Sequence, residues 1–327
     1  MVHKPEPGAA LEEAEGAAEA ADSCLVEFVV EPNYALWRLD LYLRQKLRRL
    51  SRTRIQTLIR KQLPGLKPSS PVKPGMRLQL WRHLPREPHV PGPEALGCVF
   101  EDEDLLVLNK PAGLPVHPSA RYFHNTLVAQ LAERFAKPPS PAHRLDRETS
   151  GLLVCSKTPE AGRQLMRAFA ASWVHKEYLA IAQGHPPEAC FTIDAPIAEG
   201  TATIRIAVRI APEGKPATTQ VEVLRRFERQ GSPFCLLKCM PLTGRQHQIR
   251  VHLKHAGFPL VGDKIYGPDE MYFDRFSRGL LEPGAMERLL LPRHALHASV
   301  LRFAHPRTQA PLRFESALPE DLQSFLP

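Results

Sequence analysis

The sequence predicts an α+β protein, because many strand-like segments follow one another at short spacing with few helices between them. Closely spaced strands pair most easily as hairpins, so we expect a mostly antiparallel mixed sheet flanked by helices. Two basic helical segments and a proline-rich stretch come before these strands and predict a separate, small α/β module. The strongest strand signals lie at 105–110, 152–155, 176–182, 218–224 and 234–240.

The chain is strongly basic, and its charge is unevenly distributed. The net charge is +8, yet residues 1–22 hold one lysine and six acidic residues, so the remainder carries five more positive charges than the total. Residues 1–22 have almost no large apolar side chain and predict a disordered acidic tail. The basic remainder favours an acidic partner such as nucleic acid. A basic surface that only keeps the protein soluble is the alternative.

Cysteine usage and hydropathy exclude several classes of protein. The six cysteines are scattered, and only Cys235 and Cys239 are close, with no second pair to complete a zinc site. We therefore expect reduced thiols, no metal and no cofactor. The N-terminus lacks an apolar signal core and no apolar run is long enough to span a bilayer. These features predict a soluble, cytoplasmic protein, and without a heptad seam we expect a monomer.

Residues 23–84 predict a basic module of strand, two helices and strand. Leucines and isoleucines at three- and four-residue spacing predict amphipathic helices over 37–50 and 51–61, with Ser51 as the N-cap of the second. The helices carry nine cationic residues against a single acid, Asp40. So many like charges repel unless a polyanion screens them, so we expect RNA contacts here; a solvated charged face is the alternative. The residues expected to contact RNA are Arg44, Arg52 and Arg54.

Residues 85–95 are rich in proline and predict a semi-rigid linker to a larger domain over 96–327. This domain begins with a strand at 98–100, an acidic turn, a second strand at 105–110 and a stiff loop at 111–118. A helix is expected over 125–135. Thr158 can cap another helix, which begins at Pro159 and whose inner face holds Leu165, Met166 and Phe169.

The segment from His143 to Gly151 is the strongest candidate site. It places one carboxylate, Asp146, between Arg144 and Arg147, and it runs directly into the apolar strand at 152–155. A carboxylate beside cations at the start of a buried strand indicates a functional site, whereas an aspartate that only caps a turn is the alternative.

A second candidate lies at 241–253. Thr243 followed three residues later by Gln246 predicts a capping box, which places Arg245 in the first turn of a helix. A cation gains nothing from the helix dipole at that end. Arg245 is therefore expected to face an anion.

Several segments in this order resemble the RluA-type RNA pseudouridine synthases. They are the Lys-Pro-x-Gly-Leu loop at 110–114, the Asp146 segment, Lys-x-Tyr-Leu-Ala at 176–180, Thr-Gly-Arg-x-His-Gln-Ile-Arg at 243–250, Gly-Asp-x-x-Tyr-Gly at 262–267 and Leu-His-Ala at 296–298. The N-terminal module resembles the small RNA-binding fold of the S-four type through Ser-Arg-Thr-Arg at 51–54 and the Lys-Pro-Gly turn at 73–75. The resemblance implies isomerisation of uridine to pseudouridine in RNA, with ribosomal RNA expected first and tRNA second.

The resemblance also implies roles for single residues. Asp146 would act at ribose C1′ as a nucleophile, as a stabiliser of positive charge or as a base. Arg245 would pair with Asp146, and Tyr178 would lie against the uracil and remove the C5 proton. Arg144 would fill the space that the flipped nucleotide leaves. The other residues expected to bind substrate are His143, Arg147, Lys110 and Arg250.

Two other functions compete with this interpretation. A non-catalytic RNA-binding or ribosome-assembly protein is one, although Asp146, Tyr178 and Arg245 are all present. An enzyme that cleaves phosphodiesters with some of the 14 histidines is the other, and dependence on a divalent metal would reveal it.

Overall fold

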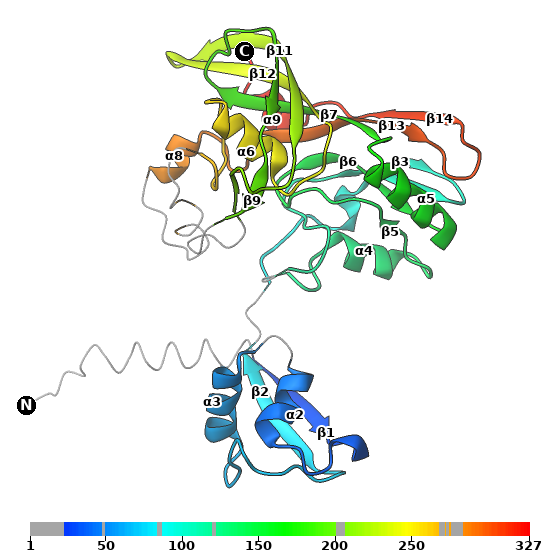
Figure 1. The fold of residues 1–327 in the computed structure, drawn as a ribbon, viewed down its shortest axis with the longest axis vertical. Coiled ribbons are helices and arrows are strands. Elements are labelled where there is room, and N and C mark those ends of the chain that lie inside the picture. The colour runs from blue at the N-terminus through cyan, green and yellow to red at the C-terminus, as the bar shows by residue number, and fades with distance from the viewer. Residues whose placement is uncertain are drawn as a thin grey trace, which may run out of the picture. The chain divides into compact units, whose positions relative to one another are not determined.

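The computed structural model describes residues 23–47, 50–83, 87–119, 122–200, 207–267, 272, 275 and 284–327. The chain divides into two compact units, Met1–Arg86 and Glu87–Pro327, each of which is treated by itself (Figure 1). The predicted acidic tail at 1–22 lies outside the described residues. Within the ranges given above, no helix combines the length and the apolar character needed to cross a bilayer.

The N-terminal unit is a two-stranded antiparallel sheet with two helices packed on it. Its elements are β1 (Ser23–Val29), η1 (Pro32–Tyr34), α2 (Leu39–Lys46), α3 (Arg52–Gln62) and β2 (Arg77–His83). The strands pair from Ser23 opposite His83 to Val29 opposite Arg77. Both predicted helices are present, and Ser51 caps the second by accepting a hydrogen bond from the Arg54 amide. The shared core contains Leu39, Leu43, Ile55, Ile59, Leu78 and Leu80.

The single acid of these helices is a buried structural centre. The Asp40 carboxylate is fully buried and accepts hydrogen bonds from Arg38 at 3.0 Å and from Arg52 at 3.1 Å. These bonds, led by that from Arg38, hold the pKa of Asp40 well below its usual range. Arg52 therefore helps to hold α3 to α2 although its side chain is 49% exposed, and Arg44 and Arg54 are exposed as well.

The C-terminal unit is built on one ten-stranded sheet. Along its main path the strands are β3 (Gly97–Glu101), β4 (Leu105–Lys110), β6 (Ser150–Ser156), β13 (Leu296–Ala304), β7 (His175–Gln183), β12 (Ser232–Pro241), β11 (Thr218–Arg229) and β8 (Cys190–Asp194); β5 (Ser140–Pro141) pairs with β6, and β14 (Pro311–Glu315) pairs with β13. Every pair on this path is antiparallel except β6 with β13, which is parallel. The predicted α+β fold with a mostly antiparallel mixed sheet is confirmed.

Helices and short elements complete the C-terminal unit (Figure 1). They are η2 (Pro93–Ala95), α4 (Leu127–Arg134), β9 (Ile197–Glu199), β10 (Val208–Ile210), α5 (Pro159–Ala170), α6 (Gln248–His255), α8 (Ala285–Leu289) and α9 (Glu320–Gln323). Thr158 caps α5 as predicted, by accepting a hydrogen bond from the Ala161 amide. The prediction that Met166 faces inward is wrong: it is 60% exposed, whereas Leu165 is buried. The two neighbours lie about 100° apart around the helix, and only Leu165 reaches the sheet.

The parallel pair at the centre of the sheet brings distant segments together. Gly151 at the start of β6 lies opposite Ala298 of β13, and Ala298 in turn lies opposite Tyr178 of β7. Gly151 has a φ of +110°, and a Cβ there would lie 2.2 Å from the Ala298 carbonyl oxygen, so only glycine fits. This close approach fixes the loop before β6, which carries Asp146, beside the strand that carries Tyr178.

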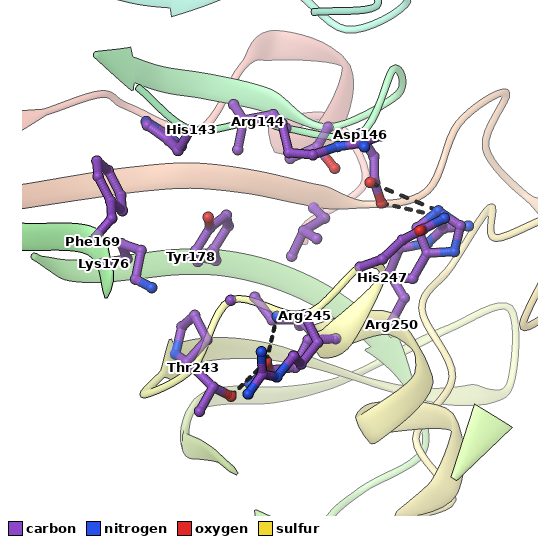
Figure 2. Close-up of a pocket in the computed structure, with 18 of the residues that line it drawn as sticks. His143, Arg144, Asp146, Phe169, Lys176, Tyr178, Thr243, Arg245, His247 and Arg250 are labelled. Atoms are coloured by element: carbon purple, nitrogen blue, oxygen red, sulfur yellow. Dashed lines mark hydrogen bonds and ion pairs between the residues drawn. The ribbon is translucent and has the colours of Figure 1, made fainter. Parts of the chain in front are cut away.

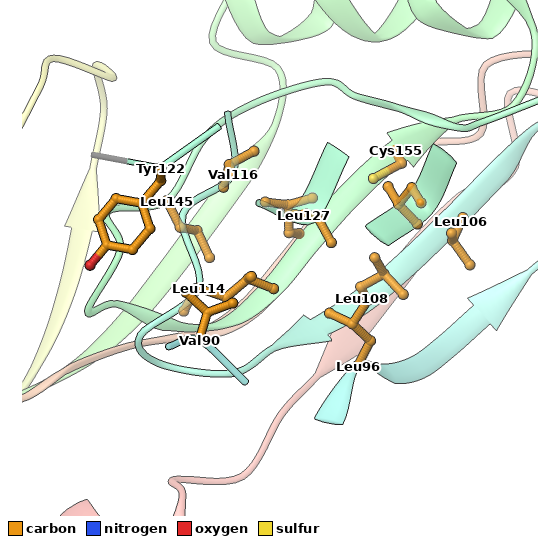
Figure 3. Close-up of a cluster of buried hydrophobic side chains, with 13 residues drawn as sticks. Val90, Leu96, Leu106, Leu108, Leu114, Val116, Tyr122, Leu127, Leu145 and Cys155 are labelled. Carbon is orange, nitrogen blue, oxygen red and sulfur yellow. The ribbon is translucent and has the colours of Figure 1, made fainter. Parts of the chain in front are cut away.

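A buried cluster under this loop holds it in place (Figure 3). Leu145, which directly precedes Asp146, is 5% exposed and packs among Leu114, Leu127 and Leu153. Burial of a leucine side chain contributes about 1.5–3 kcal/mol. The backbone next to Asp146 is thus anchored by apolar packing rather than left as a free turn.

The predicted linker at 85–95 differs from the structure, in which residues 87–95 pack against the C-terminal unit. The Glu87 carboxylate accepts hydrogen bonds from the amides of His124 and Asn125 at 2.9 and 2.7 Å. Val90 joins the buried cluster of Figure 3, and the Pro91 carbonyl accepts a hydrogen bond from Gln130. A proline-rich segment is stiff, but its carbonyls and apolar side chains remain free to pack.

Candidate active site

A cavity of about 570 Å³ lies between the Asp146 loop, the end of α5, β7 and the turn before α6. This volume is within the range of pockets that hold small organic ligands. Figure 2 shows Asp146 and Arg250 at one end of the cavity, with Tyr178 farther along it. The sequence-predicted residues Asp146, Tyr178, Arg144, His143 and Arg245 all line this one cavity.

Arg250 holds Asp146 by a buried ion pair. Its Nη1 donates to the Asp146 carboxylate at 2.9 Å. Its Nε and Nη2 donate to the two carboxylate oxygens of Asp263 at 2.7 and 2.8 Å. Asp263 is fully buried and also accepts from the amides of Ile265 and Tyr266. A guanidinium that is fixed by one carboxylate can present its remaining donors rigidly to the second.

The ion pair keeps Asp146 ionised. Burial by itself would raise the pKa of Asp146, but His247, Arg250 and His294 together lower it to about 2. Burial lowers the pKa of His247 to about 4 and that of His294 to about 3, so both rings are neutral near neutral pH. Arg250 therefore supplies the positive charge that stabilises the Asp146 carboxylate under physiological conditions.

The expected pairing of Arg245 with Asp146 is wrong in this structure. The Arg245 side chain is exposed and donates through Nε to the Pro216 carbonyl at 3.1 Å. The predicted capping box is also wrong, because α6 begins only at Gln248, whose side-chain oxygen accepts from Thr243 and from the Arg245 amide. Residues 243–247 thus form a turn before the helix, and Arg245 lies on the rim of the cavity.

The left-handed turn at His247 explains which arginine points inward. His247 has a φ of +51° and precedes the first residue of α6. Its Nδ1 lies 3.0 Å from the Tyr266 hydroxyl, and its Nε2 lies 3.8 Å from an Asp146 oxygen. Arg250 then falls within the first turn of α6 and faces the buried acids.

Tyr178 lines the cavity and packs against two buried clusters. Burial, together with the charge of Asp146, raises the pKa of Tyr178 well above its usual range. The phenol is therefore protonated near neutral pH and presents a ring and a hydroxyl to the cavity.

Lys110 is a support of the Asp146 loop, and its expected contact with substrate is wrong. The side chain is fully buried and donates to the carbonyls of Pro111, Leu114 and Arg147 at 2.8, 2.9 and 3.3 Å. Burial lowers the pKa of Lys110 to about 7, and the nearby Asp146 charge opposes this. Three carbonyl acceptors use all three donors of the ammonium.

Arg250 and Arg147 were also expected to bind substrate. In the structure both side chains form hydrogen bonds with other residues of the protein. Arg250 is 5% exposed and is committed to the two acids described above. Arg147 donates to the Tyr122 hydroxyl at 2.5 Å and to Glu148 at 2.8 Å. Arg144 differs from them, because it is exposed on the cavity wall.

His143 lines the cavity as a neutral ring. Its Nε2 accepts a hydrogen bond from the Val154 amide at 3.2 Å, and the ring stacks on Phe169 at 4.8 Å between centroids. Burial lowers the pKa of His143 to about 3. The ring can contact a ligand through its face but carries no charge near neutral pH.

The sequence interpretation missed Asp263, Glu148 and Lys264. Glu148 accepts from Lys264 at 3.0 Å and belongs to the same loop as Asp146. Asp263 and Lys264, two adjacent charged residues of the Gly-Asp-Lys segment at 262–264, are only 0 and 3% exposed. Their burial could not be read from a segment with a turn composition.

An ionised carboxylate that an arginine holds in a cavity, beside a partly buried tyrosine, is suited to nucleophilic, basic or electrostatic catalysis and indicates an enzyme. The comparisons identify its class. The model of the family described as RNA pseudouridylate synthase matches residues 104–255. The chain is 37% identical over 319 residues to an uncharacterized RNA pseudouridine synthase of Chloroflexus aurantiacus, covering 91% of this chain and 92% of that one. It is 35% identical to ribosomal large subunit pseudouridine synthase D of Zymomonas mobilis, covering 88% and 92%.

A solved structure agrees with this assignment. Human RNA pseudouridylate synthase domain containing 1 has a TM-score of 0.55 and 31% identity, covering 70% of this chain and 86% of that one. The chain belongs to the RNA pseudouridine synthase family. It is an isomerase that converts uridine to pseudouridine in RNA, as the sequence predicted.

Proposed function

We propose that this protein isomerises specific uridines of ribosomal RNA and that Asp146 is its catalytic carboxylate. Two relatives of this chain, from Zymomonas mobilis and Nitrosomonas europaea, align with most of it and are named ribosomal large subunit pseudouridine synthase D. The observation that supports the role of Asp146 is its ion pair with Arg250 at the end of a cavity. The carboxylate is thereby ionised yet only 19% exposed.

The reaction breaks the bond from ribose C1′ to N1, turns the uracil over and forms a bond from C1′ to C5. The C5 proton leaves and N1 gains a proton, so no water is consumed. Asp146 acts at C1′ as a nucleophile, as a stabiliser of positive charge or as a base for a sugar proton. Each of these roles requires an ionised, oriented carboxylate, which the Arg250 pair supplies.

Tyr178 contacts the uracil as a neutral phenol. The negative charge of Asp146 is one of two causes of its raised pKa. That contribution disappears if the carboxylate forms an ester with C1′, which makes the phenol more acidic at the stage when the C5 proton leaves. Arg144, exposed on the cavity wall, is suited to fill the space left by the flipped nucleotide.

The N-terminal unit serves as an RNA-binding module of the S-four type. Its exposed cations include Arg44 and Arg54, and the acid Asp40 is buried away from that surface. Cys98, Cys155, Cys190, Cys235 and Cys239 are free thiols, which supports a reducing compartment, the cytoplasm. We expect the protein to act there as a monomer.

A pseudouridine map tests this function. Carbodiimide-dependent stops of reverse transcription on total RNA are compared between wild type, a deletion strain and an Asp146→Asn strain. We expect the same stops in ribosomal RNA to disappear in both mutants, with Asp146→Asn protein still folded and still binding RNA. Stops that persist in the deletion strain would contradict the assignment to ribosomal RNA. Stops that persist only with Asp146→Asn would remove Asp146 from catalysis.

A further inference from the structure

The end of the cavity opposite Asp146 is lined by an aromatic pair and a lysine. Figure 2 shows His143, Phe169 and Lys176 there, with Tyr178 between them and Asp146. Lys176 and Tyr178 are two residues apart on β7, so their side chains project from the same face of the sheet. The reactions described above do not use this end of the cavity.

Lys176 differs from Lys110, the buried lysine that supports the Asp146 loop, in having no acceptor among the described residues. Lys110 donates to three carbonyls. Across the part of the chain that the structure describes, the Lys176 ammonium makes no hydrogen bond or ion pair, although burial lowers its pKa. A half-buried ammonium without an acceptor is unfavourable in the empty protein, and an anion in the cavity would stabilise it.

The chemistry of the substrate indicates that the anion at Lys176 is a phosphate. His143 is neutral, so Lys176 is the charged group among the three residues at this end. The substrate of this family is a polymer with a phosphate on each side of the target nucleoside. At about 570 Å³ the cavity is within the range of pockets that hold ligands larger than a single base, so it has room for a nucleotide and its neighbouring phosphate.

We infer that Lys176 binds the phosphodiester that joins the target uridine to its neighbour, and that Phe169 with His143 forms the apolar wall beside it. This subsite positions the flipped nucleotide so that its ribose C1′ lies at Asp146. The inference rests on the proposed site around Asp146, because it assumes that the uridine enters the same cavity.

Binding measured without turnover tests the subsite separately from catalysis. The affinity for total RNA from the deletion strain is measured at several salt concentrations. The proteins compared are Asp146→Asn and the double variants that combine Asp146→Asn with Lys176→Met, Lys176→Gln or Lys176→Arg. Lys238→Met is the matched control, since Lys238 lies on the neighbouring strand β12 opposite Leu179, hence on the other face of the sheet, and is paired with Glu222.

We expect Lys176→Met and Lys176→Gln to weaken binding about tenfold, as for the loss of one charge-assisted hydrogen bond. The slope of log affinity against log salt should become shallower by about 0.7–0.9, the value for one phosphate contact. Lys176→Arg should keep the slope, and Lys238→Met should keep both quantities.

The companion measurement is tritium release from RNA labelled at uridine C5, with Asp146 intact. Lys176→Met should raise KM with kcat changed less than about twofold, because the contact is made equally before and during the reaction. A lower kcat with unchanged affinity and salt slope would overturn the inference and place Lys176 at the reacting base. Unchanged binding and kinetics would also overturn it. Failure of the proposed function differs from both, because wild type itself would then release no tritium.

Discussion

The ion pair at the centre of the site leads to a strong prediction for Arg250→Met. Arg250 is 5% exposed and joins two carboxylates, the fully buried Asp263 and the nearly buried Asp146. Removing it leaves two negative charges close together in a poorly solvated place. Breaking a buried pair in this way costs about 3–5 kcal/mol of unfolding free energy.

The pH dependence of this loss follows from the pKa of Asp146. In the wild type that pKa is about 2, against an ordinary value of 3.8. The interactions of Asp146 with His247, Arg250 and His294 that lower this pKa together contribute about 2 kcal/mol to the free energy of unfolding above about pH 4, and this contribution is lost as the pH falls toward the folded pKa. In Arg250→Met, burial instead raises the pKa of at least one carboxyl, so the variant gains stability as it takes up a proton. The difference in free energy of unfolding between wild type and Arg250→Met should be largest near neutral pH and should become smaller in acid.

Urea unfolding followed by circular dichroism, from about pH 8 down to about pH 4, measures this difference. Adding Asp263→Asn to Arg250→Met should recover part of the stability, because only one buried charge then remains. In Arg250→Met the acid limb of the pH–activity profile should also shift to higher pH, because the pKa of Asp146 is then higher. A loss below about 1 kcal/mol, or one that is constant with pH, would refute the role given to Arg250.

Gly151→Ala should lower the thermal unfolding midpoint more than Gly231→Ala. Both positions have positive φ, but only at Gly151 would the new Cβ lie 2.2 Å from the Ala298 carbonyl oxygen. Equal shifts of the midpoint would show that this contact is unimportant. His143→Ala should destabilise the protein by about 1–3 kcal/mol at high pH. That loss should narrow below about pH 6.5, because only the unfolded wild type then binds a proton at His143, and a constant loss would mean that the pKa of the ring is the same in the folded and the unfolded protein. Asp40→Asn should destabilise the N-terminal unit above about pH 4 and progressively less below it, measured by urea unfolding; an effect that grows in acid would contradict the lowered pKa of Asp40.

The sequence by itself determined the features that depend on near neighbours in the chain. Helix caps at Ser51 and Thr158 are local, because a side chain bonds an amide three residues away. Asp146 was also found locally, from a carboxylate among cations directly before an apolar strand. The order of the segments around it was enough to predict the family, which the comparisons confirmed.

Tertiary structure alone decided which residues Asp146 meets. Arg245 and Arg250 belong to one short segment, and the sequence gives no reason to prefer the second. The left-handed turn at His247 begins α6 late, so that Arg250 faces Asp146, from which it is 104 residues distant in the chain, while Arg245 stays on the rim.

Burial was equally invisible in the sequence. Lys110 looked like a cation for RNA, yet the loops around it enclose it and supply three carbonyl acceptors. Asp263 looked like a turn residue, yet it anchors Arg250. Whether a charged side chain meets solvent, an ion partner or a backbone carbonyl depends on which strands pair in space, here β6 with β13 and β13 with β7. That pairing joins segments far apart in the chain, and no local pattern specifies it.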